Sequence, residues 1–132
     1  MQFLSITDWL WPIGIGLLVG ILISARKKHN YTNIVSLGAE EFRQNMRKGQ
    51  LIDVRSEESF KAGRINGSRN FPGMSAFANM TRFRTDQPIF IYGDKSNGVV
   101  RKAARKFIRK GFSPVYILKD GLTEWDHPLK ND

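Results

Sequence analysis

The sequence of 132 residues contains no cysteine. This absence excludes disulfide bonds, a thiolate nucleophile and metal sites with cysteine ligands. Histidine is also scarce, because the chain has only His29 and His127, and their separation does not match the spacing of metal ligands. We therefore expect neither a metal nor another cofactor.

The first 25 residues contain neither lysine nor arginine, and Asp8 is their one acidic residue. All 21 basic residues lie at or after Arg26, together with 11 of the 12 acidic residues. The chain after Ala25 thus carries a net charge of +10, which is 21 minus 11. Such a surface favours anionic partners, namely acidic lipid headgroups, nucleic acid or an acidic protein.

The segment FLSITDWLWPIGIGLLVGILISA, residues 3–25, is predominantly apolar and carries a single charge, Asp8. About 20 such residues are enough to cross a bilayer as a helix. The sequence therefore predicts a transmembrane helix over residues 1–25. A cleaved signal peptide is disfavoured because no basic residue precedes the segment, and a buried core helix is seldom this long or followed by such a basic stop.

Three basic residues, 26–28, follow the apolar segment directly. Basic residues mark the cytoplasmic side of a span. We therefore predict a single-pass protein of the cell membrane with its N-terminus outside, a basic juxtamembrane linker over residues 26–33, and a cytoplasmic domain over residues 34–132. Gly16 and Gly20 form a G-x-x-x-G pair, which suggests a homodimer through the span.

The domain alternates short apolar runs with helical patterns, which indicates an α/β fold with a mostly parallel sheet flanked by helices. The expected strands are a short one at Ile34 and Val35 and three others at residues 51–54, 89–92 and 115–118. Ser36 is expected to cap a helix that ends before Gly49, and Ser56 to cap a short helix that stops near Gly63. A longer helix is expected over residues 99–110.

The loop Gly93, Asp94, Lys95, Ser96, Asn97 and Gly98 connects the strand at residues 89–92 to that longer helix. Ligands of parallel sheets bind at such loops, and free N–H groups at a helix start attract anions. The loop also matches the first half of a Walker A motif. Val99 and Val100 follow in place of Lys and Ser or Thr, so nucleotide hydrolysis is not expected.

The helix after this loop carries cations without an intervening acid, namely Arg101, Lys102, Arg105, Lys106, Arg109 and Lys110. A solvated helix face is one interpretation, and binding of an anionic partner is the other. Nucleic acid is not expected as the partner, because no aromatic residues alternate with the cations and no nucleic-acid-binding motif is present.

Two ordered segments carry a resemblance to a known family. LIDVRSEESFKAGRINGSRNFP, residues 51–72, and RKGFSPVYILKDGLTEW, residues 109–125, are similar to the opening and closing signatures of rhodanese-like domains. The resemblance covers about residues 34–130 and implies a rhodanese-like three-layer α/β fold. Within the signatures, it implies structural roles for Asp53, Arg55 and Trp125.

The family transfers a sulfane sulfur through a persulfide on a cysteine, and the resemblance places that cysteine at Gly93. The family loop, roughly Cys-Arg-x-Gly-x-Arg-Ser, also has arginines where this chain has Asp94 and Gly98. Nucleophilic sulfur transfer requires a thiolate, which no residue here supplies. Arg64 replaces a histidine that is common in the family, and we interpret this position as structural.

The preferred hypothesis is a catalytically inactive, membrane-anchored rhodanese-like domain that acts as a binding or scaffolding module for a protein partner. The loop 93–98 and the basic helix would form its binding surface. An alternative is a component of sulfur transfer that relies on a partner or a small thiol. A third possibility is electrostatic docking to anionic lipid, which salt would weaken.

Overall fold

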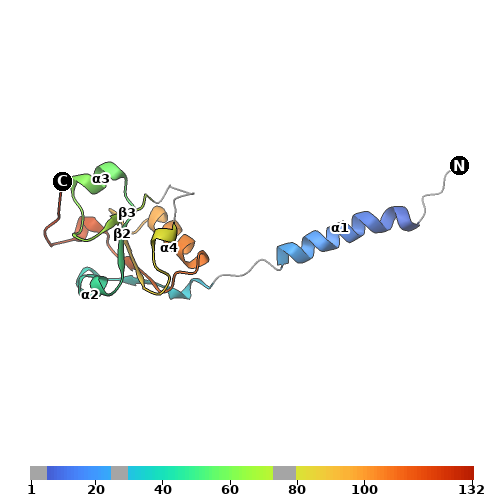
Figure 1. Ribbon diagram of the computed structural model, residues 1–132, viewed down its shortest axis with the longest axis horizontal. Coiled ribbons are helices and arrows are strands. Elements are labelled where there is room, and N and C mark those ends of the chain that lie inside the picture. Colours follow the sequence, from blue (N-terminus) through green and yellow to red (C-terminus); the bar gives the residue numbers. More distant parts are fainter. Residues whose placement is uncertain (1–5, 25–29, 73–79) are drawn as a thin grey trace.

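The computed structural model describes residues 6–24, 30–72 and 80–132 (Figure 1). Its α-helices are α1 (Ile6–Ser24), α2 (Ala39–Asn45), α3 (Glu57–Ala62) and α4 (Gly98–Arg109). Its strands are β1 (Ile34–Leu37), β2 (Gln50–Asp53), β3 (Arg69–Asn70), β4 (Ile89–Tyr92) and β5 (Val115–Leu118). Four short 3-10 turns complete the elements, namely η1 (Tyr31–Asn33), η2 (Met46–Lys48), η3 (Met80–Arg82) and η4 (Leu122–Glu124).

The five strands form one sheet in the order β1-β5-β4-β2-β3. Every pairing within it is parallel. The sheet is therefore wholly parallel, where the sequence predicted a mostly parallel one. β4 occupies its centre, between β5 and β2, and all four of its side chains are buried.

Alternate side chains of β4 supply two separate cores, one on each face of the sheet. Ile89 and Ile91 pack with helix α4, whereas Phe90 and Tyr92 pack with helix α2. This division follows from the two-residue period of a strand. A strand that is buried on both faces has no polar positions, which explains the continuous apolar run IFIY.

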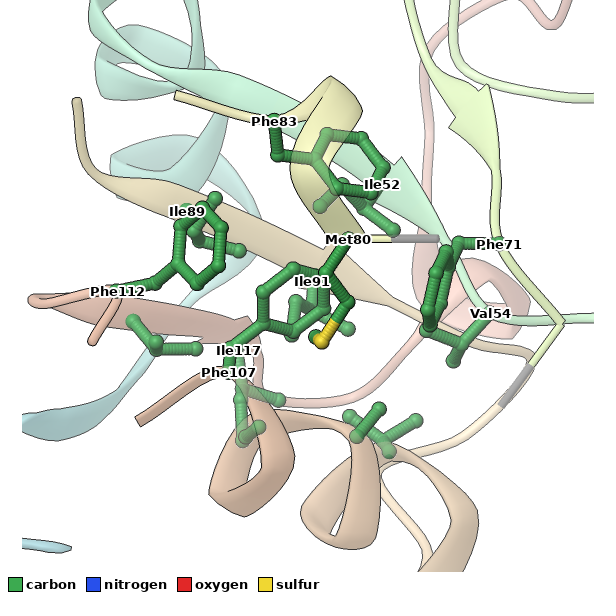
Figure 2. Close-up of a cluster of buried hydrophobic side chains, with 14 residues drawn as sticks. Ile52, Val54, Phe71, Met80, Phe83, Ile89, Ile91, Phe107, Phe112 and Ile117 are labelled. Carbon is green, nitrogen blue, oxygen red and sulfur yellow. The ribbon is translucent and has the colours of Figure 1, made fainter. Parts of the chain in front are cut away.

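The core on the α4 side is rich in aromatic rings (Figure 2). Phe107 is fully buried, and its ring lies 5.3–5.7 Å from those of Phe71, Phe83 and Phe112. Most of these pairs meet edge to face, which is a favourable geometry for aromatic side chains. Phe107 thus joins α4 to segments on both sides of it in the sequence.

The apolar N-terminal segment forms helix α1, which lies apart from the other elements in Figure 1. Within residues 6–24, 30–72 and 80–132, no helix has both the length and the apolar character needed to cross a membrane. Asp8 lies in the first turn of α1. The uncharged part of the helix, residues 9–24, is therefore about 24 Å long, which is less than the thickness of a bilayer core, about 30 Å. The transmembrane helix predicted over residues 1–25 is therefore not found in the described structure.

Two further predictions concern the part of the chain that precedes helix α2. Residues 26–29 of the predicted linker lie outside the described residues, and Tyr31–Asn33 form η1. The prediction that Ser36 caps a helix is wrong, because Ser36 pairs with Ile117 inside the sheet. Helix α2 begins later, after its N-cap residue Gly38, which has no side chain to form a capping hydrogen bond.

Other helix boundaries agree closely with the sequence. Ser56 caps α3 by accepting a hydrogen bond from the Ser59 N–H at 3.2 Å, and α3 ends before Gly63. Helix α4 begins at Gly98 and ends at Arg109, within one residue of the expected range.

Replacement of Phe107 by alanine should lower the free energy of unfolding by about 3–5 kcal/mol, because it opens a cavity among the three neighbouring rings. Urea denaturation of the two proteins measures this difference. Arg109→Ala, an exposed change on the same helix, should stay within about 0.5 kcal/mol of the wild type. Equal losses for the two variants would contradict the central position of Phe107 in this core.

Candidate functional site

The loop after β4 lies at the carboxyl end of the sheet, the edge where parallel α/β sheets bind ligands. It consists of Gly93, Asp94, Lys95, Ser96 and Asn97, and the sixth predicted site residue, Gly98, is the first residue of α4. Gly93 is buried directly after the strand, whereas Asp94 and Lys95 are exposed. The structure thus keeps the six residues together at the junction of β4 and α4.

Backbone hydrogen bonds from the turn after β5 hold the start of the loop. The carbonyl oxygen of Gly93 accepts from the Leu122 N–H at 2.8 Å, and that of Asp94 accepts from the Thr123 N–H at 3.1 Å. Gly121 precedes this turn with φ +67°, and a Cβ there would clash with the carbonyl of Asp94. Glycine at 121 therefore permits both the left-handed backbone and the close approach of the loop.

The space that a side chain at position 93 would enter is already filled. A Cβ at this position would lie 2.8 Å from Cγ2 of Val100 and 3.7 Å from Cγ2 of Val54. Val100 is itself buried, and a β-branched side chain has few rotamers by which to withdraw. Any larger residue at 93 would therefore have to displace the first turn of α4 or the side chain of Val100.

The start of α4 offers fewer free donors than the sequence suggested. The side-chain oxygen of Asn97 accepts hydrogen bonds from the backbone N–H groups of Val99 and Val100, at 3.1 and 3.4 Å. Asn97 is thus the N-cap of the helix and occupies two donors that an anion would otherwise use.

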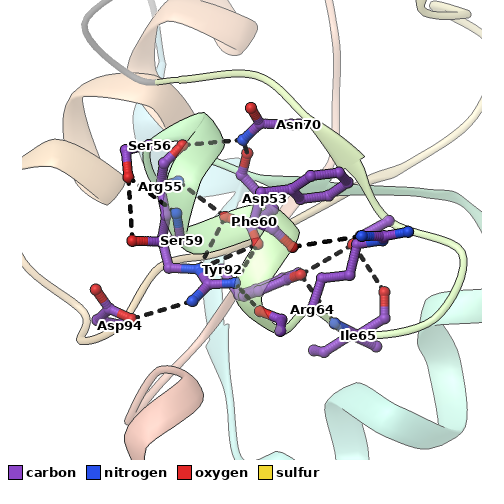
Figure 3. A network of polar contacts seen from close by, with 12 residues as sticks. Asp53, Arg55, Ser56, Ser59, Phe60, Arg64, Ile65, Asn70, Tyr92 and Asp94 are labelled. Atoms are coloured by element: carbon purple, nitrogen blue, oxygen red, sulfur yellow. Dashed lines mark hydrogen bonds and ion pairs between the residues drawn. The ribbon is translucent and has the colours of Figure 1, made fainter. Parts of the chain in front are cut away.

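A network of polar groups borders the loop on the β2 side (Figure 3). Asp53 is fully buried and accepts hydrogen bonds from the backbone N–H and the guanidinium of Arg55, the closest at 2.8 Å. Arg55 also donates to the Gly63 carbonyl and lies 3.4 Å from the Asp94 carboxylate. The side-chain amide of Asn70 donates to the carbonyls of Asp53 and Arg55. The Asp53–Arg55 pair thus ties β2 to the ends of α3 and β4, in agreement with a structural role.

Two groups in this network have shifted pKa values. Burial acts to lower the pKa of Arg55, but hydrogen bonding and charge attraction from Asp53 raise it above its ordinary value. Burial raises the pKa of Tyr92, whose hydroxyl accepts a hydrogen bond from the Ile65 N–H at 3.1 Å and lies 2.9 Å from the Ser68 hydroxyl. Arg55 therefore stays charged and Tyr92 neutral at physiological pH, so neither is poised to transfer a proton.

A hollow of about 270 Å³ lies over the loop. Its walls come from the loop and from the segment after β2, and they include Arg55, Ser56, Gly93, Asp94 and Asn97. Among the described residues, no group of three or more histidine, aspartate or glutamate side chains could hold a metal ion. The hollow is therefore a small depression of mixed polar and apolar lining, with one cation and one carboxylate in mutual contact.

The predicted basic residues cover the outer side of α4. Arg101, Lys102, Arg105 and Arg109 are exposed, and Lys106 is half-buried. The guanidinium of Arg105 lies 5.7 Å from the centre of the Tyr31 ring, and Nζ of Lys106 lies 5.9 Å from that of Phe71. In the described part of the chain, none of the four exposed cations forms an ion pair. This helix therefore presents uncompensated positive charge next to the loop.

Trp125 packs on the opposite face of the sheet, where its ring meets that of Phe42 edge to face at 6.4 Å. This contact agrees with the packing role implied by the family resemblance. The same indole also lines a second, larger cavity with Arg43, Arg47 and His127, which the sequence analysis missed. No local sequence motif indicates this cavity, because its walls come from segments that are far apart in the chain.

Comparison with known proteins gives the family. The model of the rhodanese-like domain matches residues 38–127. The chain belongs to the rhodanese-like domain family. It is 38% identical over 97 residues to the "Uncharacterized protein YqhL" of Bacillus subtilis. That alignment covers 72% of this chain and 75% of the relative. It is 33% identical over 90 residues to the "Thiosulfate sulfurtransferase GlpE" of Pseudomonas aeruginosa, covering 67% and 81% of the two chains.

Solved structures give the same fold. The crystal structure of a rhodanese-like domain protein from Staphylococcus aureus superimposes with a TM-score of 0.66 at 19% identity, covering 74% of this chain and 98% of that one. The rhodanese-like fold predicted from the two signatures is thereby confirmed. Within this rhodanese-like domain, the position after β4 is a buried glycine, and the chain contains no cysteine.

Gly93→Cys should lower the free energy of unfolding by about 1–3 kcal/mol, because its Cβ meets Val100 in a filled space. The same substitution in a Val100→Ala background should cost less, and a double-mutant cycle in urea measures that coupling. Gly98→Ala is the matched control, since a Cβ there meets nothing within 4 Å. Additive effects of Gly93→Cys and Val100→Ala would show that Val100 does not restrict position 93.

Proposed function

We propose that this protein is a catalytically inactive rhodanese-like domain that acts as a binding module. The observation that carries the proposal is the pair Gly93 and Val100. The position that the family resemblance assigns to the sulfur-carrying cysteine has no side chain, and a valine fills the adjoining space. The loop also lacks both arginines of the family pattern, with Asp94 and Gly98 in their places.

The binding surface that we propose combines Lys95 of the loop with the exposed cations of α4. Arg101 and Arg105 lie on successive turns of this helix, directly after the loop. Their charge is not balanced by described acidic side chains, which supports recognition of an anionic partner. Asn97 and Asp94 work against an anion within the loop itself, so the partner would contact side chains of the helix rather than backbone N–H groups.

The location of the protein stays a prediction. Large apolar side chains of α1, among them Trp11, Leu17 and Ile21, are more than half exposed. This exposure supports contact of α1 with a membrane or with a second copy of the chain. The basic residues 26–28 support a position of the domain next to anionic lipid headgroups, which are typical of the cytoplasmic leaflet.

A second candidate function keeps the domain in sulfur transfer, with the thiol supplied by a partner or a small molecule. The hollow of about 270 Å³ over Gly93 favours this candidate, because it leaves room for a foreign sulfur atom beside the loop. Relatives such as the thiosulfate sulfurtransferase of Pseudomonas aeruginosa give it additional support.

The purified full chain should show no thiosulfate:cyanide sulfurtransferase turnover above a boiled control, because it supplies no thiolate. Addition of a small thiol such as glutathione tests the second candidate in the same assay. Turnover by the chain alone would overturn the proposal of an inactive domain. Turnover that requires the thiol, and that Asp94→Lys alters, would favour the second candidate instead.

Replacement of Lys95, Arg101 and Arg105 by glutamate should abolish partner binding, since it reverses the charge of the proposed surface. Co-precipitation with tagged full-length protein, followed by identification of the retained proteins, measures the loss. The matched control changes Lys48, Lys61 and Lys130 to glutamate, which gives the same net charge away from α4. If the control loses the same partners, net charge rather than this surface governs binding. Sedimentation with vesicles, with and without anionic lipid, separates a lipid from a protein partner.

A further inference from the structure

The cavity lined by Trp125 lies away from the loop, on the α2 face of the domain. It has a volume of about 480 Å³, within the usual range for small-molecule sites. Gly49 and Leu51, at the amino end of β2, form part of its floor. It shares no residue with the hollow over Gly93, which lies at the carboxyl end of the sheet.

The walls of this cavity combine apolar surface with positive charge. Leu51 and Ile65 are buried members of the α2-side core, and Met46 and Trp125 pack against that core. Arg43 and Arg47 bring two guanidinium groups from α2 and η2 to the same cavity. No aspartate or glutamate is among the lining residues.

Glu40 contacts two of the lining residues, and it compensates only part of their charge. Its carboxylate lies 3.7 Å from the Arg43 guanidinium and 3.7 Å from Nε2 of His127. Arg47, by contrast, forms no ion pair with a described residue and is exposed. The cavity therefore retains at least one cation that is available to a ligand.

The indole of Trp125 provides an independent observation. Its Nε1 is buried and has no hydrogen-bond acceptor among the described residues. A buried donor without an acceptor is destabilising, and tryptophan N–H groups usually find a partner when buried. Because this Nε1 is shielded from solvent, it lies behind the wall of the cavity, and its signal reports on any change in packing of the Trp125 ring there.

We propose that this cavity binds a small organic carboxylate with an apolar body. The apolar body would lie against Leu51, Ile65 and the Trp125 ring. The carboxylate would pair with Arg47, and with Arg43 in competition with Glu40. The site is independent of the proposed function, because its residues belong neither to the loop 93–98 nor to α4.

The test is titration of the ¹⁵N-labelled full chain with phenylacetate, followed through the indole N–H signal of Trp125. Trp125→Phe identifies that signal among the three indoles of the chain. We expect a saturable shift at millimolar phenylacetate, and a much smaller one with the neutral isostere phenylacetamide. Inorganic phosphate should shift the signal little, because it lacks an apolar body.

Arg47→Gln should weaken phenylacetate binding about tenfold, the cost of losing one charge-assisted hydrogen bond. Arg43→Gln is a second variant, and both changes are exposed, so the fold should persist. Lys119→Gln, an exposed position directly after β5, is the matched control and should leave the affinity unchanged. The proposal is overturned by the absence of a saturable shift, by equal shifts with phenylacetamide, or by an equal loss of affinity in the Lys119→Gln control.

Discussion

The burial of β4 on both faces of a parallel sheet is the constraint on which the other features depend. Its neighbours β5 and β2 hold it by backbone hydrogen bonds, and its alternate side chains enter two different cores. A strand enclosed in this way can leave the sheet only at its end. The chain must therefore turn sharply after Tyr92, and that turn determines where Gly93 and the start of α4 lie.

The turn is held by groups from several segments, and this explains how it keeps its form with a glycine at its first position. The η4 turn donates two backbone hydrogen bonds to it, Asn97 caps the following helix, and Arg55 contacts Asp94. None of these interactions involves a side chain at position 93. A glycine at position 93 therefore costs the fold little, and the contact that a Cβ there would make with Val100 favours glycine over a larger residue.

Elements defined by local patterns were predictable from the sequence. The runs 89–92 and 115–118 are continuous, apolar and bounded by proline, glycine or polar residues, and both strands have the predicted bounds. The prediction that Ser36 caps a helix was wrong because the cap-like pattern is a local signal, whereas the pairing of Ser36 with Ile117 depends on a strand far along the chain. The contact between Val100 and position 93 could not be predicted either, since it depends on how the first turn of α4 meets the end of β4. The cavity lined by Arg43, Arg47 and Trp125 depends even more strongly on tertiary packing.

The two candidate sites differ in how their positive charge is arranged. At the loop, the anion-binding devices of the backbone are used internally, because Asn97 accepts from two helix N–H groups and Asp94 adds a carboxylate. Recognition there would rely on long, solvated side chains of α4, which suits a broad and salt-sensitive contact with a macromolecule. In the cavity beside Trp125, two arginines adjoin buried apolar walls and an unsatisfied indole N–H. The apolar wall beside these exposed cations suits one small ligand that carries both an apolar body and an anionic group.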